Sequence, residues 1–120
     1  MRRSLTKIEI LRKKEDINRI FSKGRRYNLD GMRLISLSNN LSYDRFIVIP
    51  AKKYGNSVAR NKIRRQAKEI FRNWEKRHSD INGGQSDGLD IILVVYPGRV
   101  SGFSLLESDF HSLLDRIIRK

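Results

Sequence analysis

The chain has 120 residues, of which 38% are hydrophobic, and its 26 lysines and arginines outnumber its 13 aspartates and glutamates, giving a formal net charge of +13. The sequence contains no cysteine and no apolar run long enough to cross a membrane, which excludes disulfide scaffolds, thiolate metal sites, cysteine nucleophiles and membrane-spanning helices. We therefore expect one cytoplasmic domain over residues 1–120, without a signal peptide, whose charge favours a polyanionic partner.

The first predicted element is a helix over residues 13–23. Ile17, Ile20 and Phe21 recur there at helical spacing, and Gly24 follows as a stop signal. Acidic and basic residues fill the positions between the apolar ones. The pattern indicates an amphipathic helix that packs one face on the rest of the fold.

Two strand patterns follow, at residues 32–38 and 43–50. The polar residues 38–40 separate them and predict a hairpin loop. Pro50 ends the second strand because proline cannot donate a backbone hydrogen bond to a neighbouring strand.

A long helix is predicted over residues 57–77. The sequence Gly55-Asn56-Ser57 supplies a turn and an N-cap before it. The apolar residues of this segment fall on one stripe of the helix, and they are Ile63, Ala67, Ile70, Phe71 and Trp74. This position makes Trp74 a core residue rather than a platform for stacking on a base.

The last third of the chain predicts a loop, a strand and a helix. Glycines mark residues 80–88 as the loop, and the nearly continuous apolar run at 90–97 indicates a strand buried on both faces. Residues 105–118 show helical periodicity, with Ser104 as the expected N-cap. The order helix, strands, helix, strand, helix predicts an α/β (α+β) sandwich in which three helices pack on a small mixed sheet.

The positive charge is concentrated in two segments. Residues 1–26 hold ten basic and three acidic side chains, residues 52–78 hold ten and two, and the remaining residues are slightly acidic in total. At 100° per residue, most basic side chains of the helix at 57–77 point away from its apolar stripe, while Arg60 lies nearer the edge of that stripe. Solvated helix faces usually mix charges of both signs, so this row predicts a phosphate-backbone contact. The candidate RNA-binding residues are Lys52, Lys53, Arg60, Asn61, Lys62, Arg64, Arg65, Lys68 and Arg72.

The stretch KKYGNSVARNKIRRQAKEIFR at residues 52–72 resembles the central signature of the ribonuclease P protein family. In that family a lysine-rich strand end and a Gly-Asn turn precede an Arg-Asn-Arg core that opens a basic helix. Here the core is Arg60-Asn61-Lys62, so the third position keeps its charge and lacks the forked geometry of arginine. The other predicted elements follow the family's order, and the resemblance covers most of the chain from about residue 10.

The resemblance implies a protein subunit that binds a catalytic RNA and the 5′ leader of precursor tRNA, and that assists the Mg²⁺-dependent endonucleolytic removal of this leader. The RNA would hold the Mg²⁺ ions and carry out the hydrolysis, so we expect no catalytic residue, metal site or bound cofactor in the chain itself. The Arg-Asn-Arg helix region would bind the catalytic RNA. The leader would lie in a cleft between the first helix and the sheet, where the matching positions are Ile17, Phe21 and Ile35. The resemblance also implies a left-handed βαβ crossover, and it includes neither DNA nor a membrane among the partners.

Three other interpretations compete with this one. A plain RNA-binding module, such as a ribosomal protein, would use the same basic helix, and charge alone does not separate the two. A self-sufficient nuclease needs a carboxylate or histidine constellation, but His78 and His111 are far apart and fit no catalytic or metal-binding spacing. A basic peripheral membrane protein needs an exposed apolar face beside its basic helix. The signature at 52–72 favours the ribonuclease P interpretation.

Overall fold

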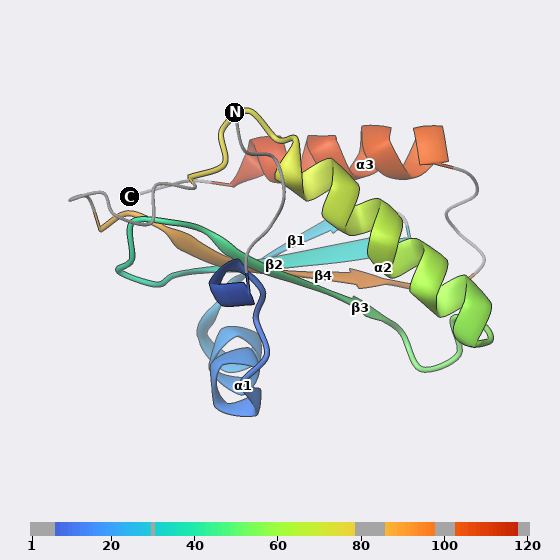
Figure 1. Ribbon diagram of the computed structural model, residues 1–120, viewed down its shortest axis with the longest axis horizontal. Coiled ribbons are helices and arrows are strands. Elements are labelled where there is room, and N and C mark those ends of the chain that lie inside the picture. The colour runs from blue at the N-terminus through green and yellow to red at the C-terminus, as the bar shows by residue number, and fades with distance from the viewer. Residues whose placement is uncertain (1–6, 30, 79–85, 98–102, 118–120) are drawn as a thin grey trace.

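The computed structural model describes residues 7–29, 31–78, 86–97 and 103–117 (Figure 1). After a short 3-10 helix at Lys7–Glu9, the elements are α1 (Lys14–Lys23), β1 (Arg25–Leu29), β2 (Met32–Ser38), β3 (Arg45–Pro50), α2 (Ser57–Arg72), β4 (Leu89–Val95) and α3 (Phe103–Arg116). This confirms the predicted order of helix, strands, helix, strand and helix.

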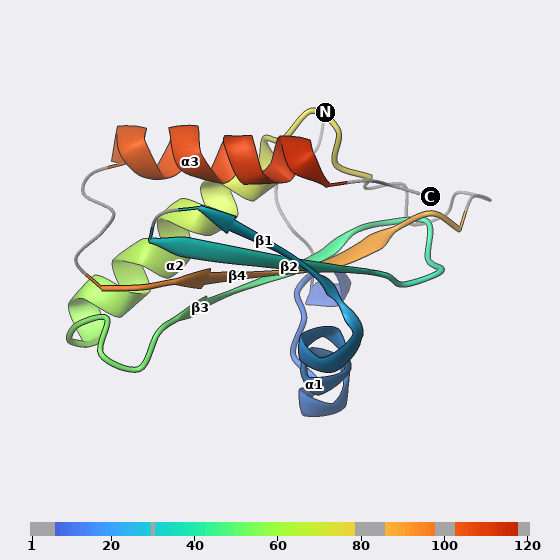
Figure 2. The same ribbon diagram turned by 180° about the vertical axis from the view of Figure 1, so that it is seen from behind.

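The four strands form one mixed sheet in the order β1-β2-β4-β3. β1 and β2 are antiparallel, β2 and β4 are antiparallel, and β3 runs parallel to β4. α2 carries the chain from β3 back to β4 across one face of the sheet, and this crossover is left-handed (Figures 1 and 2). Most such connections are right-handed, so the topology matches the unusual feature that the family resemblance implied.

The predicted hairpin between β2 and β3 is wrong, because β4 lies between these two strands. Every residue of β4 is buried, and a strand that is apolar on both sides is most stable at the centre of a sheet. The true hairpin joins β2 to β1, a strand that the sequence patterns did not reveal. Gly31 lies in its turn with a φ of 85°, a left-handed conformation that favours glycine.

Helices cover both faces of the sheet. α2 and α3 lie over one face and α1 over the other, so the sheet is the middle layer of a sandwich (Figures 1 and 2). The larger part of the core lies under α2 and α3, where Phe46 stacks on Phe71 with ring centroids 4.5 Å apart and on Phe110 at 5.7 Å. The smaller part lies under α1 and includes Ile20 and Ile92.

Two helix boundaries differ from their predictions. α2 ends at Arg72, so Trp74 lies just beyond the helix, yet its side chain is only 7% exposed and belongs to the larger core as predicted. α3 begins at Phe103, which packs against that core, so Ser104 lies within the helix and does not cap it. Ile118 and residues 80–85 of the predicted loop lie outside the described residues.

Candidate RNA-binding surface

α2 separates an apolar face from a basic one, as the sequence predicted. Its buried side chains are Ile63, Ala67, Ile70 and Phe71. On the remaining arc the candidate residues are exposed at Asn61, Lys62 and Arg65 and half-buried at Arg64, Lys68 and Arg72. Asn56 is the N-cap of the helix, and its side chain accepts a hydrogen bond from the backbone N–H of Ala59 at 2.9 Å. A fixed N-terminus keeps these cations in one row along the helix.

Arg60 fixes the loop that leads into α2. Its guanidinium donates to the backbone oxygen of Ala51 at 2.9 Å and to that of Pro50 at 3.2 Å. The side chain therefore anchors the end of β3 to the start of α2, as its position near the edge of the apolar stripe allows. Lys52 and Lys53 are exposed in the loop that Arg60 holds, and they extend the basic row.

Two contacts between neighbouring side chains affect the row, one its orientation and one its charge. Arg64 donates to the side-chain oxygen of Asn61 at 3.1 Å, which orients its guanidinium along the helix surface. Arg72 forms an ion pair with Glu69, so part of its charge is neutralised. The strongest positive charge of α2 thus lies in about two turns before Glu69, from Asn61 to Lys68.

The other face of the sheet is apolar and only partly covered. α1 packs on β2 and β4, and among the described residues it is the only α-helix on this face (Figure 1). Ile17 and Phe21 are half-buried along the edge of α1, so both reach the surface. Ile35 is 0% exposed beneath α1, so it forms part of the core and offers no surface to a ligand in this structure.

Tyr96 brings an aromatic ring to this face, although the sequence analysis did not single it out. Ile47, Ile49 and Tyr96 are half-buried and pack against the same cluster as α1. Tyr96 follows Ile92 and Val94 at intervals of two residues, and this spacing places all three on one side of the strand. The two-residue spacing of side chains along a strand was therefore the signal that could have pointed to Tyr96.

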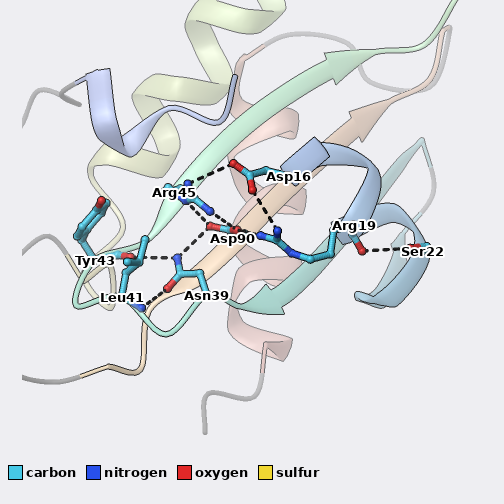
Figure 3. Close-up of polar contacts among 8 residues, drawn as sticks. All are labelled: Asp16, Arg19, Ser22, Asn39, Leu41, Tyr43, Arg45 and Asp90. Atoms are coloured by element: carbon cyan, nitrogen blue, oxygen red, sulfur yellow. Dashed lines mark hydrogen bonds and ion pairs between the residues drawn. The ribbon is translucent and has the colours of Figure 1, made fainter. Parts of the chain in front are cut away.

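An ion network holds α1 to the sheet (Figure 3). The carboxylate of Asp90 on β4 is fully buried and accepts two hydrogen bonds from Arg45, both at 2.7 Å, and one from Asn39 at 2.9 Å. Arg19 of α1 lies 3.6 Å from the same carboxylate, and Asp16 bridges Arg19 at 3.1 Å and Arg45 at 3.5 Å. Hydrogen bonding to Asp90 raises the pKa of Arg45. The network fixes the position of α1, because Asp16 and Arg19 on the helix bind Arg45 and Asp90 on the sheet. It contains two acids and two bases, so it adds no net charge.

Two further pairs of titratable side chains lie away from this network. Arg77 and Glu9 are both buried and lie 2.9 Å apart, which ties the N-terminal segment to the chain after α2. His78 Nδ1 lies 3.1 Å from Asp87. Within the described residues, no three His, Asp or Glu side chains gather where a metal ion could bind. None of the helices in the same ranges has the length and hydrophobicity of a membrane-spanning segment.

The mixed sheet, the left-handed crossover and the outward basic row define a small α/β protein suited to binding a polyanion. Comparison with known proteins narrows this class. Residues 5–118 match the family model of ribonuclease P. The chain therefore belongs to the ribonuclease P protein family. It is a protein component of this ribonucleoprotein endoribonuclease, whose activity depends on an RNA subunit and which functions in tRNA 5′ processing.

Individual relatives agree with this assignment. The chain is 29% identical over 116 residues to the ribonuclease P protein component of Dictyoglomus thermophilum, which covers 97% of this chain and 88% of that protein. It is 38% identical over 93 residues to that of Borreliella burgdorferi, covering 76% and 73%. The structure of the RNase P protein from Thermotoga maritima aligns with a TM-score of 0.73 at 25% identity, covering 92% of this chain and 98% of that one.

Proposed function

We propose that the basic row of α2 binds the catalytic RNA of ribonuclease P, and that the open apolar face beside α1 binds the 5′ leader of precursor tRNA. The observation that carries this proposal is the placement of the two surfaces on opposite faces of one sheet (Figures 1 and 2). A protein with this layout can contact both RNAs at once and hold the leader next to the ribozyme. The Mg²⁺ ions for hydrolysis would then be held by the RNA.

Charge supports the assignment of α2. Lys62, Arg64, Arg65 and Lys68 lie within two turns of one helix, and the only acidic side chain of α2 is Glu69. Each phosphate that such a cation neutralises releases counterions from the RNA, which favours binding at low salt. Lys52 and Lys53 would continue the contact past the start of the helix.

Shape and polarity support the assignment of the α1 face. Unpaired nucleotides bind proteins by laying their bases on aromatic and apolar side chains. Phe21 and Tyr96 supply aromatic rings on this face, and Ile17, Ile47 and Ile49 supply apolar surface. Ile35 would act from below, as part of the core on which α1 rests.

Processing of precursor tRNA tests the proposal as a whole. With its cognate catalytic RNA, the protein should raise cleavage most at low salt and low Mg²⁺, because a charge of +13 offsets the repulsion between two polyanions. The protein without RNA should not cleave. Efficient cleavage by the RNA-free protein would overturn the proposal in favour of a self-sufficient nuclease.

Charge removal on α2 tests the surface itself. Arg64→Ala with Lys68→Ala should weaken binding to the catalytic RNA and flatten its salt dependence, by about 0.9 in log–log slope per lost duplex phosphate contact. Arg33→Ala with Arg116→Ala removes the same charge near β1, since both side chains hydrogen-bond to Asn28. Equal losses in the two double variants would mean that net charge matters and the position of the row does not.

A further inference from the structure

The segment before α1 forms part of a binding surface with α2. Ile10 makes a parallel bridge to Phe46 at the edge of the sheet, and the backbone N–H of Leu11 donates to the oxygen of Phe46 at 3.0 Å. These contacts fix the segment alongside β3, whose other neighbour is β4. They place Ile10 and Leu11 opposite the basic row of α2, so a hollow remains between them.

This hollow has a volume of about 310 Å³ and a mixed lining. Its apolar part includes Ile10, Leu11 and Ile47, and its cations are Arg12, Arg64 and Lys68. No acidic side chain is among the described residues that line it. A wider hollow of about 500 Å³ continues along α2; it shares Ile10, Arg64 and Lys68 and also includes the acidic Glu69.

The mixed lining narrows the chemistry of the ligand. An RNA duplex exposes its phosphates, while its bases are paired and stacked, so it offers no apolar surface to side chains that lie between cations. An unpaired nucleotide offers both an apolar base and a charged phosphate.

We propose that this hollow, the Ile10 pocket, binds one unpaired RNA nucleotide. The base lies against Ile10 and Ile47, and its phosphate contacts the cations Arg12, Arg64 and Lys68. The inference rests on the proposed function, because the RNA must dock on α2 before a nucleotide can enter. The pocket lies at the β3 edge, between the α2 row and the α1 face, so the nucleotide belongs either to the catalytic RNA or to the leader.

The test compares two substitutions with the same chemistry. Ile10→Asp places a carboxylate in the pocket, whereas Ile8→Asp makes the same change two residues away, at a side chain that is 49% exposed and does not line the pocket. Ile10→Val keeps the apolar surface. All three variants are checked by thermal melting and then titrated with the catalytic RNA, and the unpaired bases are probed with dimethyl sulfate at A and C, kethoxal at G and a carbodiimide at U.

We expect Ile10→Asp to bind RNA at least about fivefold more weakly than Ile8→Asp, from a base contact of the usual strength. One unpaired base should be protected by the wild type, Ile8→Asp and Ile10→Val, and reactive with Ile10→Asp. Protection in the complex with catalytic RNA alone assigns the nucleotide to that RNA. Protection that appears only with precursor tRNA, and is absent with mature tRNA, assigns it to the leader.

The proposal fails if Ile10→Asp and Ile8→Asp bind RNA equally, or if no base changes its reactivity between them. These outcomes leave the proposed function intact as long as the wild type binds the catalytic RNA and the Arg64→Ala, Lys68→Ala variant binds it more weakly. Failure of the wild type to bind the catalytic RNA would instead overturn the proposed function.

Discussion

Replacing Arg45 with methionine should destabilise the fold strongly, because it leaves a buried carboxylate without its main partner. Asp90 is 0% exposed and would lose two hydrogen bonds of 2.7 Å. Removing one partner of a buried ion pair costs about 3–5 kcal/mol. Asn39 at 2.9 Å and Arg19 at 3.6 Å remain near the carboxylate, and the Arg45 side chain is itself 19% exposed. Both facts set the expected loss at the lower end, about 3 kcal/mol, or roughly 10 °C in melting temperature for a domain of this size.

Urea unfolding and thermal melting of three variants measure this effect. Arg33→Met is the control, because its hydrogen bond to Asn28 is exposed and its loss should change stability by no more than about 0.5 kcal/mol. Arg45→Met combined with Asp90→Leu should recover much of the stability, since an apolar pair can replace a buried ion pair at little cost. The reasoning is refuted if Arg45→Met melts close to the wild type, or if the double variant is less stable than Arg45→Met alone.

Three further substitutions test other parts of the structure. Gly88→Ala should cost about 1–3 kcal/mol in urea unfolding, because a Cβ there would overlap the backbone oxygens of Tyr43 and Leu41; a variant as stable as the wild type would contradict this close packing. Trp74→Ala should lower the free energy of unfolding by about 3–5 kcal/mol. A loss below about 1 kcal/mol would show that Trp74 does not belong to the core. Phe21→Ala should weaken binding of precursor tRNA by up to about 3 kcal/mol if a base stacks there, with mature tRNA and catalytic RNA bound as before. A parallel fall of all three affinities would show that Phe21 acts through the fold.

Elements with strong local signals were predictable from the sequence. α2 has both an N-cap at Asn56 and an apolar stripe, and β4 is apolar at nearly every position. β1 was not predicted, because three of the five residues in its sequence, RRYNL, are polar or charged and show no alternation of apolar and polar side chains. The strand order was mispredicted for another reason. The loop at residues 38–40 gives no sign that β4, which comes much later in the chain, lies between β2 and β3.

The candidate site divides in the same way. Periodicity placed the cations of α2 on its outer face because a helix fixes direction through sequence spacing alone. The family resemblance put Ile35 in the cleft between the first helix and the sheet, but only the tertiary structure shows that α1 covers it. The Ile10 pocket depends on where residues 10–12 run relative to β3, and no local pattern encodes that placement.

The central position of β4 has a consequence for synthesis on the ribosome. When residues up to His78 have emerged, the β1–β2 hairpin, β3 and α2 are all present, but β2 and β3 have no strand to join them. Met32 on β2 and Pro50 on β3 both pair with Val95 on β4. The sheet can therefore form completely only after β4 is translated. Contacts so distant in sequence make folding slow. The nascent chain therefore exposes a basic helix before it has the sheet that orients it, and contacts between this helix and RNA in that interval involve an unfinished protein.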